Sequence, residues 1–124
     1  MECQLGRKLN VSLFSLRGDT SEQALLALID EIVNAIGMNK AYMADVYRYP
    51  VGGRGGEGMT ILQTITESYI IIDAWPGHSG FYLNVSSCKF FDEHTLRHVL
   101  NECEYKVIDS GGDVLTLPEP EETL

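Results

Sequence analysis

Apolar residues recur every three or four positions between Thr20 and Ile36, a spacing that places them on one face of a helix. This apolar face consists of Leu25, Leu28, Ile29, Ile32, Val33 and Ile36. Thr20 and Gln23 match a capping box, and Gly37 suits the position just after a helix end. The pattern predicts a helix over 20–36 whose apolar face lies on a sheet.

Apolar and polar positions alternate in most of the remaining chain, which predicts strands. The expected strands are 8–16, 41–49, 59–66, 69–75 and 80–87, and a second helix follows a cap at Asp92 and extends to residue 102. Pro50 is expected to stop the second strand. The stretch 69–75 is nearly all apolar, which is typical of a central strand buried on both faces. The glycines of Ser110-Gly111-Gly112 predict a terminal hairpin formed by 105–109 and 113–117.

This order of elements is typical of an α+β domain. We expect a two-layer sandwich, with a mostly antiparallel sheet and two helices on one face. A chain of 124 residues suits one domain, here 1–117, followed by a loose acidic tail over 118–124.

The formal net charge of −9 argues against nucleic acid and anionic membranes as partners. The longest apolar run is shorter than the roughly 18 residues of a membrane span, and the start of the chain does not match a signal peptide. We therefore expect a cytoplasmic protein. Cys3, Cys88 and Cys103 are odd in number and widely spaced, which argues against a disulfide framework. The histidines and cysteines lack the spacing of a metal site, so no metal is expected.

Residues 64–78 carry the candidate chemistry. They predict a strand, a tight break at Glu67-Ser68, a second strand and a Trp75-Pro76 exit. A hydroxyl beside a backbone carbonyl at a tight turn attacks it at high effective concentration. Attack by Ser68 on the Glu67 carbonyl, followed by elimination and hydrolysis, would leave a pyruvoyl group at residue 68. A serine at a turn is otherwise only a turn residue.

Glu67-Ser68, the apolar strand, Trp75-Pro76 and a cysteine twenty residues after the serine resemble the self-cleavage region of the prokaryotic S-adenosylmethionine decarboxylases. The resemblance implies cleavage into a β chain, 1–67, and an α chain, 68–124. It also implies a pyruvoyl cofactor made from Ser68, which forms a Schiff base with the substrate amine. The implied activity is decarboxylation of S-adenosylmethionine for spermidine synthesis, in a homodimer with sites near the subunit interface.

The same resemblance implies roles for individual residues. Cys88 stands at the position of the proton donor to the substrate carbon, and Thr60 replaces a serine whose hydroxyl helps processing. Asp73 stands where the family has a histidine that acts on the α-proton. Asp73 and His78 are equal candidates to replace that histidine as the base. As alternatives, Asp73 is a solvated strand residue and Cys88 a small core residue.

The substrate-binding positions differ from the family pattern. Gly77 stands where the family has a glutamate that clamps the ribose hydroxyls, and glycine has no side chain for that contact. Asp73 instead suits the distal ammonium or guanidinium of ornithine or arginine. Trp75 and Tyr49 are further candidates for contact with the substrate, with packing as the alternative role.

Three functions remain open from the sequence. They are an S-adenosylmethionine decarboxylase, a related decarboxylase of ornithine or arginine, and an uncut homologue that acts as a binding or regulatory module.

Overall fold

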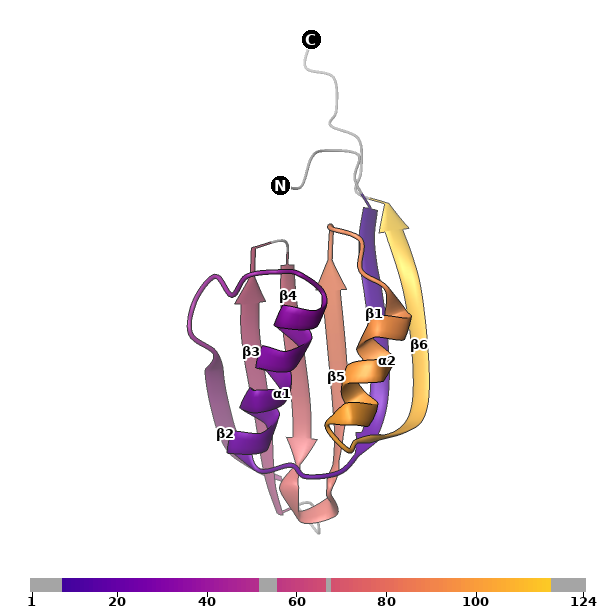
Figure 1. Ribbon diagram of the computed structural model, residues 1–124. Coiled ribbons are helices and arrows are strands. Elements are labelled where there is room, and N and C mark those ends of the chain that lie inside the picture. The colour runs from indigo at the N-terminus through magenta and orange to yellow at the C-terminus, as the bar shows by residue number, and fades with distance from the viewer. Residues whose placement is uncertain (1–7, 52–55, 67, 117–124) are drawn as a thin grey trace.

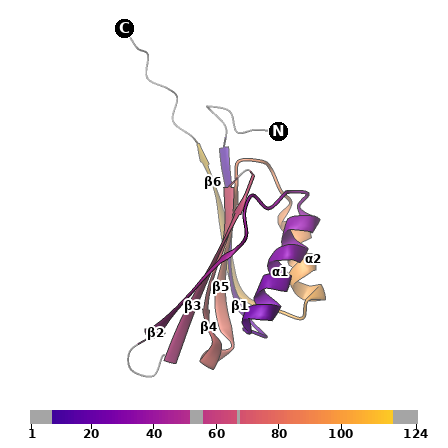
Figure 2. The same cartoon turned by 90° about the vertical axis from the view of Figure 1, so that its left-hand side faces the viewer.

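The computed structural model describes residues 8–51, 56–66 and 68–116. They form a six-stranded antiparallel sheet with two helices on one face (Figure 1). The side view shows that both helices lie on the same side of the sheet (Figure 2). This confirms the two-layer α+β architecture expected from the sequence.

The sheet order is β2-β3-β4-β5-β1-β6. The elements are β1 (Lys8–Arg17), α1 (Glu22–Ala35), β2 (Asp45–Val51), β3 (Gly56–Ile65), β4 (Ser68–Trp75), the short 3₁₀ helix η1 (Pro76–His78), β5 (Gly80–Ser87), α2 (Glu93–Glu102) and β6 (Lys106–Thr116). Within the described ranges, neither α-helix is long and apolar enough to span a membrane. The expected tail, 118–124, lies outside those ranges.

The core lies between the helices and the sheet. Its most deeply buried side chains include Leu25, Leu28, Ile29 and Ile32 from α1, Ile61, Ile70, Ile72 and Leu83 from the sheet, and Leu96 and Leu100 from α2. Burying each such side chain contributes about 1.5–3 kcal/mol relative to exposure in water. The helix faces predicted from the apolar spacing are therefore the faces that pack on the sheet.

The N-terminal cap of helix α1 lies one residue later than predicted. The side chain of Ser21, not of Thr20, accepts a hydrogen bond from the backbone nitrogen of Ala24 at 3.2 Å. The Thr20 hydroxyl donates instead to the carbonyl oxygen of Pro76. The capping-box prediction was wrong because two adjacent hydroxyl residues compete for the cap position. At the other end, Gly37 has a φ of 70°, as expected for the residue after a helix.

Strand β2 begins at Asp45, later than expected, and continues through Pro50. It is an edge strand, and an edge position tolerates a proline that cannot donate to a neighbour. The prediction that Pro50 stops the strand was therefore wrong. Tyr42 falls within the expected strand 41–49 but precedes the observed one, and it is 78% exposed.

Strand β4 is buried on one face only. Ile70, Ile72 and Ala74 lie in the core, whereas Ile71 and Asp73 are half-buried on the face without helices. The expectation of burial on both faces was wrong because the two helices cover the same side of the sheet (Figure 2). We refer to the uncovered side as the open face.

The predicted terminal hairpin is a single strand. β6 pairs with β1 along its full length, from Lys8 opposite Thr116 to Arg17 opposite Lys106. Gly112 approaches β1 closely, because a Cβ built there would lie 3.0 Å from the carbonyl oxygen of Val11. Gly112 therefore reflects close strand packing rather than a turn, whereas a Cβ built on Gly111 has nothing within 4 Å.

Candidate functional site

Ser68 is the first residue of β4. It pairs with Ile65 on β3 and with Ser87 on β5, and its side chain is half-buried. Only Thr66 and Glu67 connect β3 to β4, and Glu67 lies outside the described residues. The predicted tight break before Ser68 is therefore a two-residue connection between neighbouring antiparallel strands.

Cys88 directly follows the residue that pairs with Ser68. Ser87 is fully buried, and its carbonyl oxygen accepts a hydrogen bond from Asn10 at 3.2 Å. This bond joins the end of β5 to β1, on the side of β5 away from β4. Cys88 is disulfide-bonded in the structure. The odd number and wide spacing of the cysteines had argued against a disulfide framework. The proton-donor role that the family resemblance implies for Cys88 would require the reduced thiol.

A chain of three polar side chains crosses the open face. Thr60 on β3 is directly opposite Asp73 on β4, and its hydroxyl donates to Oδ1 of Asp73 at 2.7 Å. The hydroxyl of Tyr49 on β2 lies 2.9 Å from Oγ1 of Thr60. The Thr60 hydroxyl has a single O–H, which it donates to Asp73, so it accepts its second hydrogen bond from the hydroxyl of Tyr49. The three side chains form a directional chain that ends at Asp73.

Gly58 makes room for this chain. A Cβ built on Gly58 would lie 2.4 Å from Cε2 of Tyr49, so the tyrosine ring occupies the space of a missing side chain. Any larger residue at position 58 has to displace Tyr49 from Thr60. The sequence analysis missed Gly58, although an isolated glycine within a strand pattern often marks a close approach.

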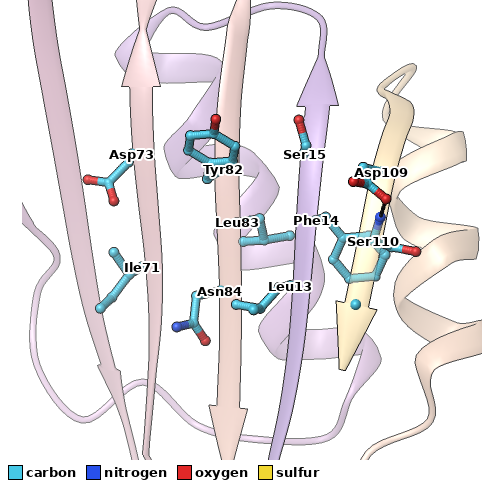
Figure 3. Close-up of a pocket in the computed structure, with 11 residues that line it drawn as sticks. Leu13, Phe14, Ser15, Ile71, Asp73, Tyr82, Leu83, Asn84, Asp109 and Ser110 are labelled. Atoms are coloured by element: carbon cyan, nitrogen blue, oxygen red, sulfur yellow. Dashed lines mark hydrogen bonds between the residues drawn. The ribbon is translucent and has the colours of Figure 1, made fainter. Parts of the chain in front are cut away.

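Asp73 also lines a hollow of about 530 Å³ on the open face (Figure 3). Leu13, Ile71 and Tyr82 give this hollow an apolar lining, while Asn84 and Asp109 add polar groups. Asp73 and Asp109 lie toward opposite sides of it, on β4 and β6 (Figure 3). Apolar walls with a few polar groups are typical of small-molecule sites, and carboxylates favour cationic ligands.

Trp75 and His78 line a second hollow of about 400 Å³ at the end of β4. The ring of Trp75 meets that of Tyr82 edge to face, with centroids 5.5 Å apart. Arg17 lines the same hollow. Gly77 has no other atom within 4 Å of a built Cβ, so the space beside it is open.

The family model for S-adenosylmethionine decarboxylase matches residues 13–105, which is most of the chain. The chain belongs to the S-adenosylmethionine decarboxylase family. Among solved structures, it is similar to the adenosylmethionine decarboxylase from Aquifex aeolicus VF5, with 16% identity, 98% of each chain covered and a TM-score of 0.63. That similarity shows a shared fold. No match was found among the curated proteins.

The predicted site residues of this S-adenosylmethionine decarboxylase family member fall into three groups, of which the first contains Ser68 and the second contains Asp73. Ser68 and Cys88 lie at one end of the central strands, while Thr60, Asp73 and Tyr49 lie on the open face. Trp75, Gly77 and His78 lie at the far end of β4. Ser68 and Asp73 are five positions apart on the strand, or roughly 16 Å. A single chain therefore does not bring the first two groups together.

Within the described ranges, no group of three histidine, cysteine, aspartate or glutamate side chains is arranged to hold a metal ion. The residues that the sequence analysis missed are Gly58, Tyr82, Asn84 and Asp109. Tyr82 and Asn84 follow the open-face alternation of β5, a signal that the sequence carried. The position of Asp109 depends on β6 being one continuous strand.

Proposed function

We propose that this protein is a pyruvoyl-dependent decarboxylase that cuts its own chain between Glu67 and Ser68. The observation that carries the proposal is the position of Ser68, at the head of a central strand after a two-residue connection, in a member of this family. The residues around Ser68 fit the group that the cut would generate, because Ser87 and Cys88 flank its strand end.

The cut follows from the chemistry of serine. The Ser68 oxygen attacks the carbonyl carbon of residue 67, the peptide C–N bond breaks, and an ester joins the two parts of the chain. Loss of the Ser68 α-proton then breaks the ester C–O bond and leaves a carboxylate on residue 67. The dehydroalanine formed at position 68 takes up water and releases ammonia, which leaves a pyruvoyl group.

The sheet order favours survival of the fold after the cut. Strands β2 and β3 belong to residues 1–67, β4 and β5 to residues 68–124, β1 again to the first part and β6 to the second. The two parts therefore alternate across the sheet and are joined by three interfaces between strands (Figure 1). Hydrogen bonds and the common core hold them together without the peptide bond.

When present, the pyruvoyl group supplies a carbonyl that accepts the substrate amine and the electrons released with carbon dioxide. The chain's own residues supply the rest. Reduced Cys88, beside the strand end, donates a proton to the substrate carbon. Asp73, oriented by Thr60, accepts a proton or binds a cationic group of the substrate. His78 is the alternative base.

A homodimer joins the group that contains Ser68 to the group that contains Asp73. The open face exposes large apolar side chains, including Leu13, Tyr47 and Tyr82, each at least 45% exposed. Burying these on a second copy favours association. In this arrangement residue 68 of one copy, which is a chain end at the head of β4 after the cut, acts together with Asp73 of the other.

S-adenosylmethionine is the first substrate to test, with spermidine synthesis in the cytoplasm as the metabolic role. A smaller basic amino acid, ornithine or arginine, is the second. The open space beside Gly77 favours the second, because no side chain there reaches the ribose hydroxyls. The hollow between Asp73 and Asp109 also suits an ammonium or guanidinium group.

The test is release of labelled carbon dioxide by the purified, reduced protein from each of the three substrates, with Ser68→Ala as the matched control. Release that Ser68→Ala abolishes supports the proposal, and the active substrate identifies the specificity. If the wild-type chain is inactive on all three, the proposed decarboxylase activity is wrong, and a binding or regulatory role becomes the alternative.

A further inference from the structure

The segment that follows α1 lies against the end of β3, next to Ser68. Residues 37–42 leave the helix and pass over this end of the sheet (Figure 1). Asn39 accepts a hydrogen bond through its carbonyl oxygen from the backbone nitrogen of Thr66 at 3.0 Å, and a second from the Thr66 hydroxyl at 3.4 Å. Ala41 donates its backbone N–H to the carbonyl oxygen of Thr64 at 3.0 Å. Thr66 is thus held from outside its own hairpin.

A buried amide fixes the same segment from the core side. Gln63 is only 2% exposed, among apolar neighbours, and its Nε2 donates to the carbonyl oxygens of Tyr42 at 2.7 Å and Thr64 at 2.8 Å. Both N–H donors of the side chain are therefore used. A buried amide is unfavourable unless its donors are satisfied, so the position of Gln63 depends on segment 37–42.

Lys89 ties the segment to the other neighbour of Ser68. Its Nζ donates to the carbonyl oxygen of Gly37 at 3.0 Å, and its backbone N–H donates to Oγ of Ser87 at 3.0 Å. Ser87 is the residue on β5 that pairs with Ser68. Segment 37–42 is thereby bonded to the strands on both sides of β4.

The connection between β3 and β4 has a chemical reason to need this support. Two-residue hairpin connections favour Gly, Asn or Asp, which adopt positive φ values at low cost. Thr66 and Glu67 are not among these residue types, so the sequence of the connection does not by itself specify a tight turn. The two hydrogen bonds that Thr66 donates to the carbonyl oxygen of Asn39 fix the position of the connection instead.

We propose that segment 37–42, held by Gln63 and Lys89, positions Thr66 and Ser87 on either side of the Glu67–Ser68 bond for the self-cleavage proposed above. The inference rests on that proposed function. Gln63 and Lys89 act through Thr66 and Ser87, so they are positioning residues. Their loss slows the cut without removing any reacting group.

The first measurement is amide hydrogen exchange in a Ser68→Ala background, where the chain stays intact. Gln63→Met removes both donors at nearly constant size and is expected to lower the protection of the Ala41 and Thr66 amides about tenfold. Lys89→Met, at a half-buried position outside the hydrophobic core, is expected to lower this protection about threefold. Lys40→Met is the matched control, because Lys40 lies on the same segment and its replacement removes only an exposed ion pair with Asp30 of α1. Unchanged protection in both test variants would overturn the inference.

The second measurement follows the cut itself, by intact mass, in freshly synthesised chains with Ser68 present. Gln63→Met is expected to slow the cut about tenfold and Lys89→Met about threefold, while Lys40→Met cuts at the wild-type rate. A wild-type chain that is never cut overturns the proposed function and this inference together. Wild-type rates in both test variants, or equal slowing by Lys40→Met, overturn the inference alone.

Discussion

Ser68 and Asp73 lie on the same strand, five residues apart, and their side chains lie on opposite faces of the sheet. Ser68 shares its face with Ile70 and Ile72 under the helices, whereas Asp73 lies in the hollow on the open face (Figure 3). The odd spacing makes this unavoidable in a regular strand. The two residues meet in one site only if two copies of the chain contribute to it.

This arrangement predicts that two inactive variants restore activity when they are combined. Ser68→Ala cannot form the cofactor, and Asp73→Asn lacks the carboxylate. In a mixed dimer, one of the two sites receives an intact Ser68 and an intact Asp73. After unfolding and refolding of an equal mixture, we expect about a quarter of the wild-type decarboxylase activity, since half of the dimers are mixed. Activity no higher than that of the separate variants would place both residues in one chain.

Gly58 is predicted to control the position of Tyr49. Gly58→Ala places a Cβ inside the space of the tyrosine ring and breaks its bond to Thr60. We expect decarboxylation to fall between tenfold and a hundredfold, which is roughly the cost of misplacing a catalytic group by 1 Å. Tyr49→Phe is expected to lose a similar share of the decarboxylase activity. The double variant Gly58→Ala/Tyr49→Phe is expected to lose no more than either single variant. Tyr47→Phe, on the same face of β2, is the control.

The hydroxyl of Thr60 is predicted to matter more than its methyl group. Thr60→Ser keeps the donor to Asp73 and is expected to retain activity within about threefold, since one hydroxyl makes the same hydrogen bond. Thr60→Val keeps the shape but leaves Oδ1 of Asp73 without this donor, and we expect a loss of about tenfold or more. Steady-state decarboxylation rates of the two variants, measured with Cys88 reduced to the same extent in both, test this. Equal rates would show that Thr60 only packs.

Much of the fold followed from local patterns in the sequence. The strand at Gly80–Ser87 and the helix capped by Asp92 were predicted with the observed bounds, because alternation and capping are local signals. The single strand β6 was not, since its glycines also suit a turn and only the length of β1 favours an extended partner. Which face of β4 is buried likewise depends on where both helices pack.

The candidate site also combines residues that local sequence predicts with contacts that depend on the assembled sheet. Ser68 was predicted as a site residue because its neighbours in the sequence carry the signal, and this prediction is still to be tested. The pairing of Thr60 with Asp73 depends on the register of β3 against β4, and the contact of Tyr49 with Gly58 depends on β2 against β3. Such relations between strands are set by the whole sheet and are not encoded at one position.

Tyr105 is predicted to make the protein less stable in alkaline solution. Burial, together with the charge of Asp19, raises the pKa of Tyr105 to about 12, and its hydroxyl donates to the carbonyl oxygen of Asp19 at 2.8 Å. In the unfolded chain the phenol ionises near its usual pKa of about 10. The folded state therefore keeps a proton that the unfolded state loses, so this contribution is complete below pH 10 and disappears as the pH rises toward 12.

Urea unfolding at pH 9 and pH 11 measures this contribution. Tyr105→Phe is expected to cost about 1 kcal/mol at pH 9, for the lost hydrogen bond. It is also expected to lose less stability than the wild type between the two pH values. An equal loss in both proteins would assign the alkaline sensitivity to other groups.

The central claim is the cut before Ser68, and intact mass of the purified chain tests it most directly. The account predicts two fragments, 1–67 and 68–124, that remain together until denatured, with the second lighter by one ammonia than a simple hydrolysis product. Ser68→Ala should give one uncut chain. A wild-type protein that keeps the mass of all 124 residues after prolonged incubation would contradict the account.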